Sequence, residues 1–152
     1  MLRAALHRRI THTPWSADGV YERLLRADIG IIPIDTTDAH IVPDALVPTW
    51  QVKSENRLTL KMALGLPVIA TPIPSYEAVL QHGFNGFFAS TRGDWKRYFD
   101  ELRDPALRAK MGARARQSVI ERFSSDLQAQ RLVDCIGRAH LRHRRAVMNA
   151  ST

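Results

Sequence analysis

The clearest pattern of apolar and polar positions lies between residues 53 and 76. Apolar residues spaced by four and five positions predict a short helix over residues 58–64, with one apolar side. Gly65 follows where a left-handed residue commonly ends a helix. The run Val68–Ala70 is continuously apolar, which is typical of a parallel strand buried on both faces. Ser75 is then predicted to cap the next helix.

Similar patterns continue on both sides of this stretch. An isoleucine-rich run over residues 28–34 predicts a second strand buried on both faces, and weaker signals predict strands over 8–12 and 87–89. The predicted helices cover residues 16–26, 75–82, 94–102 and 105–122, and a last one starts at residue 124. This alternation predicts an α/β fold, with a partial Rossmann-like parallel sheet of about four strands flanked by helices. Ligands of such open sheets bind beyond the carboxyl ends of the strands.

A long segment over residues 35–52 interrupts the alternation. It shows no periodicity and contains Pro43 and Pro48. Loops of this length in compact domains are usually either functional or disordered. Because this one leads directly into the central stretch, we favour a functional loop.

Composition adds an argument about partners. The 152 residues carry a net charge of +7 and a pI of 10.3, which indicate anionic partners. Phosphorylated substrates and a membrane surface would qualify, and a plain solvated basic surface is the alternative. Nucleic acid is disfavoured because no binding motif is present and aromatic residues are few. The single cysteine, Cys135, excludes an internal disulfide and fits a cytoplasmic protein.

Three segments carry a family resemblance. They read ADIGIIPI at residues 27–34, KMALGLPVIATPIPSYEAVLQHGFNGFFAS at 61–90 and LRDPALRAKMGARARQSVIERFS at 102–124. In this order they resemble the C-terminal, donor-binding domain of retaining glycosyltransferases of group 1, which have the GT-B fold. The resemblance implies a truncated Rossmann-like donor-binding domain at residues 1–128, followed by a basic C-terminal helix and tail at 129–152. It also implies a nucleotide-sugar substrate, with no cofactor and no metal.

Two departures from the family matter. Its members carry a pair of glutamates on the loop and helix that hold the sugar and ribose. Counted back from Gly65, those positions hold Val52 and Leu60, whose side chains cannot accept a hydrogen bond from a hydroxyl. The loop instead reads KSENR at residues 53–57, similar to a branch of the family with Lys-Ser-x-Asn-Arg. The acceptor-binding N-terminal domain and the first strands of the donor domain are expected to be missing.

The same loop supplies the candidate donor- and phosphate-binding residues. Lys53 and Arg57 stand four positions apart at a predicted helix N-terminus, where free N–H groups and partial positive charge favour an anion such as a diphosphate. A pair of solvated basic residues is the alternative. Ser54 and Asn56 could bind phosphate or sugar, or simply cap the helix. Thr71, at the carboxyl end of the central strand, would line the pocket or serve only in packing. No catalytic residue can be named.

The last predicted helix has two sides of different chemistry. Its apolar stripe contains Leu132, Cys135, Ile136 and Ala139, and a basic arc lies beside it. The members of that arc are Arg131, Arg138, Arg142 and Arg145. Docking of the stripe on the core, with Cys135 buried, is the favoured interpretation. In the alternative, the docked helix turns its basic edge toward the inner face of the membrane, to which the protein would be peripheral.

Together these observations predict a donor-binding fragment of a glycosyltransferase, inactive alone. A non-catalytic nucleotide- or anion-binding module is the alternative, and a second chain could supply the missing half. The edge of the sheet is expected to be poorly protected, which promotes association. His40, with Asp35 and Asp38 nearby, matches no common spacing of metal ligands.

Overall fold

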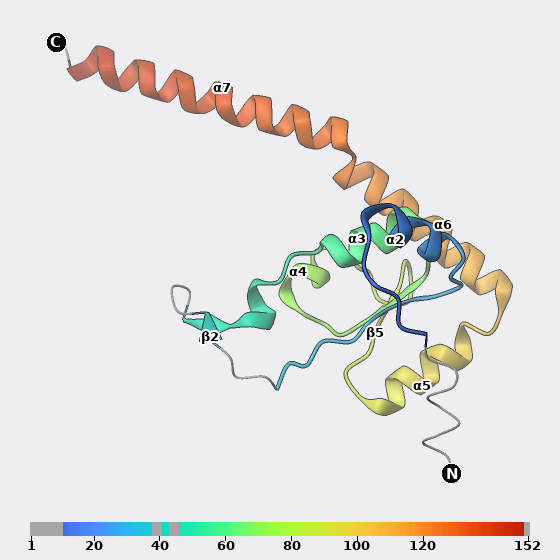
Figure 1. Ribbon diagram of the computed structural model, residues 1–152. Helices are drawn as coiled ribbons and strands as arrows, with labels where there is room; N and C mark the ends of the chain where they lie inside the picture. The colour runs from blue at the N-terminus through green and yellow to red at the C-terminus, as the bar shows by residue number, and fades with distance from the viewer. Residues whose placement is uncertain (1–10, 38–40, 43–45, 151–152) are drawn as a thin grey trace.

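The computed structural model describes residues 11–37, 41–42 and 46–150. Helices and strands alternate along the chain (Figure 1). The helices are α2 (Ala17–Leu25), the 3-10 helix η1 (Thr49–Val52), α3 (Asn56–Ala63), α4 (Pro74–Glu77), α5 (Arg92–Glu101), α6 (Pro105–Phe123) and α7 (Ser125–Ala150). The strands are β1 (Gly30–Ile32), β2 (Ile41–Val42), β3 (Val47–Pro48), β4 (Val68–Ala70) and β5 (Phe87–Phe88).

The centre of the fold is a parallel sheet. Within the described residues it has three strands, in the order β1-β4-β5. Gly30 lies beside Val68, and Ile69 lies beside Phe87. The predicted α/β fold with a parallel sheet and flanking helices is therefore confirmed. The strand predicted over residues 8–12 falls mostly outside the described residues, and Thr11 and His12 belong to no strand.

Two apolar clusters cover the faces of this sheet. Val68 and Ala70 of β4 pack with α3, α4 and α6 on one face. Ile69 points the opposite way and packs with β5, α5 and the first half of α6. This alternation is the period of two expected of a strand, and all three residues are 0% exposed. The prediction of a central strand buried on both faces is confirmed.

The turn after α3 places that helix against α6. Gly65 has a φ of +77°, which glycine adopts without strain. The N–H of Gly65 donates to the carbonyl of Met62, and the N–H of Leu66 donates to that of Lys61. These two bonds form a Schellman motif, so the predicted stop at Gly65 is confirmed. Arg116 of α6 donates to the carbonyl of Ala63, which ties α6 to the end of α3.

Two predicted helix starts were misplaced. The N-cap of α4 is Ile73, and Pro74 occupies the first turn, so Ser75 lies inside the helix. Proline is favoured there because its fixed φ suits the first turn and its missing N–H has no intrahelical partner. The N-cap of α5 is Thr91, while Asp94 completes a capping box at the third helical position. α4 also ends at Glu77, earlier than predicted.

The segment predicted to be irregular, residues 35–52, has some regular structure. β2 and β3 pair antiparallel, with Ile41 beside Pro48, and η1 follows at once. The hairpin was missed because each strand is only two residues long. His40 and Asp38 lie outside the described residues.

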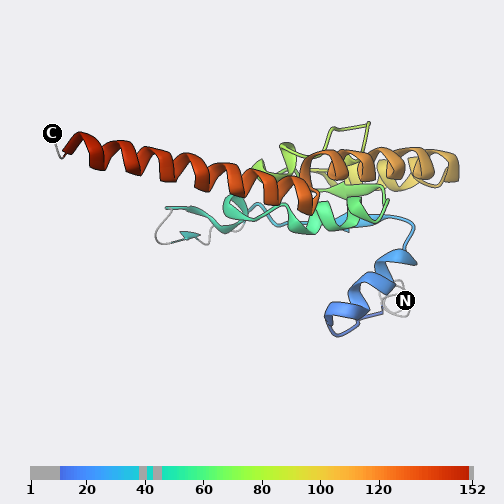
Figure 2. The same ribbon diagram turned by 90° about the horizontal axis from the view of Figure 1, so that it is seen from above.

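The last helix does not dock on the core as predicted. α7 extends away from the body of the molecule after its first turns (Figures 1 and 2). Leu132 and Ile136 are 61% and 60% exposed, and Cys135 is exposed instead of buried. The stripe stays open because α7 contacts the fold mainly at its start, where it meets α6. Leu25 at the end of α2 is also exposed.

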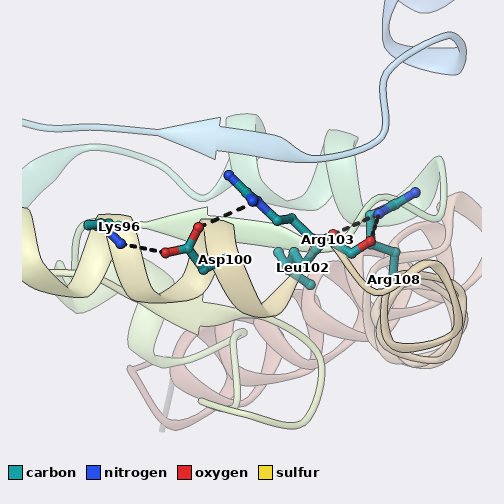
Figure 3. A network of polar contacts seen from close by, with 5 residues as sticks. All are labelled: Lys96, Asp100, Leu102, Arg103 and Arg108. Carbon is teal, nitrogen blue, oxygen red and sulfur yellow. Dashed lines mark hydrogen bonds and ion pairs between the residues drawn. The ribbon is translucent and has the colours of Figure 1, made fainter.

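A polar network fixes the corner between α5 and α6 (Figure 3). Asp100 accepts from Lys96 at 2.7 Å and pairs with Arg103 at 3.4 Å. Arg108, on the first turn of α6, donates to the carbonyls of Leu102 and Arg103 at the end of α5. The hydrogen bond from Lys96 lowers the pKa of the Asp100 carboxyl. The exposed ion pairs of this network contribute little to stability.

The open edge of the sheet should drive association. Among the described strands β1 lies at an edge, and its Ile31 is 48% exposed, contrary to the prediction of burial on both faces. Gly30 and Ile32 direct their backbone bonds toward β4, so the backbone groups of Ile31 point to the open side. We expect purified protein to self-associate in sedimentation velocity runs, and Ile31→Lys to reduce that association. Ile120→Lys is the matched control, since Ile120 on α6 is 45% exposed. If both variants reduce self-association equally, the open edge of β1 is not its cause.

Candidate anion-binding site

The loop before α3 forms a small basic hollow. Lys53, Ser54 and Arg57 line it together with Tyr76 of α4, and its volume is about 140 Å³. α3 begins at Asn56, with Glu55 as its N-cap, and no side chain caps its first N–H groups. The hollow therefore combines two cationic side chains, a hydroxyl and an uncapped helix N-terminus. Such a combination favours an anion.

The positive charge of Arg57 affects two neighbouring ionisable groups. Burial lowers the pKa of Lys61, and the positive charge of Arg57 one turn earlier lowers it further. Burial raises the pKa of Tyr76, while the charge of Arg57 opposes that rise. The charge of Arg57 thus acts on the pKa of both neighbours. Within the described part of the chain, neither Lys53 nor Arg57 takes part in an ion pair.

The structure separates the residues predicted for the site. Lys53, Ser54 and Arg57 line one hollow. Asn56 lies one position away in sequence but lines a different hollow, which it shares with Tyr21 of α2 and Phe123 of α6. It points elsewhere because successive helical residues are about 100° apart. The alternative that Ser54 or Asn56 caps α3 is wrong.

Thr71 lies in a third, larger hollow at the carboxyl ends of the three parallel strands. Its Oγ1 accepts a hydrogen bond of 3.0 Å from the N–H of Ile34, just after β1. This bond links the two chain segments just beyond the ends of β1 and β4, where the hydrogen bonds of the sheet stop. Thr71 therefore has a clear structural role, and it does not share the hollow of Lys53 and Arg57.

Sequence reasoning missed Tyr76 as a lining residue. It is only 1% exposed, and it packs in the core cluster beneath the basic hollow. Its sequence position could have indicated this role. Tyr76 lies on the first helical turn after a buried strand, and ligands of open sheets bind at the carboxyl ends of such strands. Val52, at one of the positions where the resembling family has a glutamate, is 53% exposed. Leu60, at the other, lines the hollow of Asn56.

His82 has a structural role that its position did not reveal. Its Nδ1 accepts from the N–H of Phe88 at 3.0 Å, and its Nε2 lies 3.3 Å from the hydroxyl of Tyr98. The ring also contacts Phe87 edge-on. His82 thus joins β5 to α5 and is not available to the basic hollow.

Among the described residues, no group of three histidine, cysteine, aspartate or glutamate side chains is placed to hold a metal ion. No helix in the same ranges is both long and apolar enough to cross a bilayer.

Comparison with known proteins adds the family context. No family model matches the sequence. A segment of 69 residues is 39% identical to N-acetyl-alpha-D-glucosaminyl L-malate synthase from Bacillus anthracis, covering 43% of this chain and 18% of that protein. The fold matches a crystal structure of Anabaena Alr3699/HepE in complex with UDP and glucose, with a TM-score of 0.70 and 17% identity. That match covers 90% of this chain and 34% of HepE.

The chain resembles part of a glycosyltransferase. The structural match extends over nearly all of this chain, so the predicted resemblance to GT-B glycosyltransferases is confirmed at the level of the fold. The sequence match is to a synthase whose name describes a glucosaminyl product. This glycosyltransferase-like chain spans about a third of HepE and less than a fifth of the curated relative.

Proposed function

We propose that this chain is the donor-binding part of a glycosyltransferase and binds the diphosphate of a nucleotide sugar in the hollow of Lys53, Ser54, Arg57 and Tyr76. The observation that carries the proposal is the convergence of two unpaired cations with an uncapped helix N-terminus. The comparison with a fold that holds UDP and glucose supports it. Residues 1–128 would then form the donor-binding unit and residues 129–152 a separate basic helix.

The hollow fits the proposed ligand in size and charge. At about 140 Å³ it is smaller than the roughly 300 Å³ of a typical pocket for a whole small molecule, so it suits a phosphate group rather than a nucleoside. In a transfer reaction, negative charge grows on the diphosphate as the glycosidic bond breaks. Lys53 and Arg57 would stabilise that charge, and the arginine can bind two phosphate oxygens at once.

The acceptor side of such a reaction would come from protein outside this sequence, either further residues of a longer chain or a second chain. We therefore still predict that this chain alone transfers no sugar. The alternative, a non-catalytic nucleotide- or anion-binding module, is favoured by Val52 and Leu60, which offer no carboxylate where the resembling family has one. Both functions require the same anion site.

The anion site predicts a large loss of nucleotide affinity on removal of its cations. Each charge-assisted contact contributes about 1.5–3 kcal/mol, so Lys53→Ala/Arg57→Ala should weaken UDP binding by about a hundredfold or more. Isothermal titration of the full chain measures this. The matched control is Arg92→Ala/Lys110→Ala, which removes the same charge from exposed positions away from the hollow. Equal weakening by both variants would mean that the general positive field, and not this site, binds UDP.

A second proposal concerns α7, whose apolar side is open. Leu132, Val133 and Ile136 are each about 60% exposed, and Arg138 and Arg142 lie along the flank of this stripe. An amphipathic helix of this kind lies in the headgroup region of an anionic membrane. We propose that α7 holds the protein at the inner face of the membrane, where it remains cytoplasmic and peripheral.

Binding to vesicles tests this proposal. The chain should co-sediment with vesicles of phosphatidylglycerol and phosphatidylcholine, and not with phosphatidylcholine alone. Each basic residue near an anionic surface contributes about 1 kcal/mol, so Arg138→Ala/Arg142→Ala should weaken binding by about thirtyfold. The Arg92→Ala/Lys110→Ala variant should bind as the parent does. If the parent chain fails to bind anionic vesicles, attachment to the membrane through α7 is rejected.

A further inference from the structure

Tyr76 forms the floor of the basic hollow, and its hydroxyl has no partner within the fold. The residue is 1% exposed and packs in the same apolar cluster as Leu58 and Met62. Among the described residues, no group forms a hydrogen bond with the Tyr76 hydroxyl, and the only fully enclosed side-chain polar atom without a partner is the Oγ of Ser75. The hydroxyl of Tyr76 is therefore reachable, and the space that it reaches is the hollow that the residue lines.

A hydroxyl in this position does nothing for the stability of the fold. A phenylalanine ring would fill the same space in the core without a polar atom that needs a partner. The partner of the hydroxyl must accordingly come from the hollow, as water or as a ligand. Burial raises the pKa of the Tyr76 phenol, and the charge of Arg57 opposes that rise, so this cation lies within electrostatic reach of the hydroxyl. The phenol keeps its proton at neutral pH and can donate to an anion that Arg57 binds.

The hollow has an exposed rim and a rigid floor. Lys53, Ser54 and Arg57 at the rim are exposed side chains, whereas the core holds Tyr76 in place. The two cations of the rim can bind any small anion, because their long side chains adapt to it. A planar carboxylate has two oxygens, and the cations of the rim use both. A tetrahedral phosphate presents a further oxygen toward the floor, where the Tyr76 hydroxyl can donate to it.

We propose that Tyr76 determines the specificity of this hollow, in that its hydroxyl donates to a single phosphate group and selects phosphate over carboxylate. This inference rests on the proposed function, since it concerns the same anion site. It also predicts how that site is regulated. At about 140 Å³ the hollow has room for one phosphate group, so free inorganic phosphate should compete for it with the phosphate of a nucleotide.

Tyr76→Phe tests the role of the hydroxyl, because it keeps the ring and removes only the donor. Isothermal titration of the full chain should show UDP binding weakened by about tenfold or more, while chemical denaturation shows stability that is unchanged or higher. Inorganic phosphate should displace UDP from the parent chain more effectively than acetate does, and Tyr76→Phe should remove that difference. Tyr98→Phe is the matched control, since the hydroxyl of this buried tyrosine lies 3.3 Å from the Nε2 of His82. It should lower stability and leave UDP affinity unchanged.

The outcomes separate failure of this inference from failure of the anion site. If Lys53→Ala/Arg57→Ala loses UDP affinity and Tyr76→Phe does not, the role of Tyr76 is overturned and the anion site stands. If neither variant changes UDP affinity, both are rejected. A loss of stability in Tyr76→Phe as large as that in Tyr98→Phe would also overturn the inference, because the hydroxyl would then have a partner in the fold. If UDP does not bind, phosphorus NMR titration with inorganic phosphate gives the same comparison, and equal affinity of parent and Tyr76→Phe overturns it.

Discussion

Gly112→Ala should lower the free energy of unfolding by about 3 kcal/mol, because the new methyl group has no room. A Cβ at Gly112 would lie 2.0 Å from the carbonyl oxygen of Gly65 and 3.0 Å from its carbon. That carbonyl cannot move easily, since the Schellman bonds at the end of α3 fix the turn. Relief would require α3 and α6 to separate, and these two helices share one apolar cluster.

Chemical denaturation followed by circular dichroism measures this loss. A domain of this size has a total stability of about 5–15 kcal/mol, so the variant could be partly unfolded without denaturant. Gly137→Ala is the control, because a Cβ there meets nothing within 4 Å in α7. Alanine should stabilise that helix by up to about 1 kcal/mol. If Gly112→Ala were as stable as the parent protein, the close contact between α6 and the turn at Gly65 would be wrong.

Asn85→Leu should be the second most damaging change. Asn85 is 0% exposed, and its Oδ1 accepts from the N–H of Gln81 at 2.7 Å. Its Nδ2 donates to Ser118 at 3.1 Å and to the carbonyl of Val79 at 3.4 Å. A leucine of similar size would leave these partners without their bonds, at about 1–3 kcal/mol for each buried group. We expect a total loss of roughly 3–5 kcal/mol in the same denaturation experiment.

Ser118→Ala provides a graded comparison for this variant. It removes one of the three partners of Asn85, so it should cost only about 1 kcal/mol. If stability increases from Asn85→Leu to Ser118→Ala to the parent protein, the asparagine side chain holds the turn between α4 and β5 against α6. Equal stability of all three proteins would show that this turn contributes nothing to the fold.

The sequence by itself determined the elements whose causes are local. The stop at Gly65 follows from a residue that adopts positive φ without strain, and the strand Val68–Ala70 follows from a continuous apolar run. The start of α6 at Asp104 and Pro105 and the cap of α2 at Ser16 follow from side chains that bond within three residues. Each of these predictions needed only a short window of the chain.

Competition between neighbouring signals made other local predictions fail. Ser75 and Asp94 are both residues that can cap a helix, yet Ile73 and Thr91 hold the cap positions. In α4 the proline at the first turn fixes where the helix begins. In α5 the capping box needs Asp94 at the third helical position, where its carboxylate reaches back to the N–H of Thr91 at 2.8 Å.

Only the tertiary structure decided how the candidate site is assembled and which surfaces stay open. Lys53 and Arg57 meet Tyr76 because α3 and α4 pack on the same face of β4, across a sequence distance that no periodicity encodes. Thr71 is separated from them because its hydroxyl is directed to the end of β1. The apolar stripe of α7 predicted a face buried on the core, and this prediction is wrong, because the stripe is exposed. A periodic pattern shows that a face is apolar without showing which partner, if any, lies beside it.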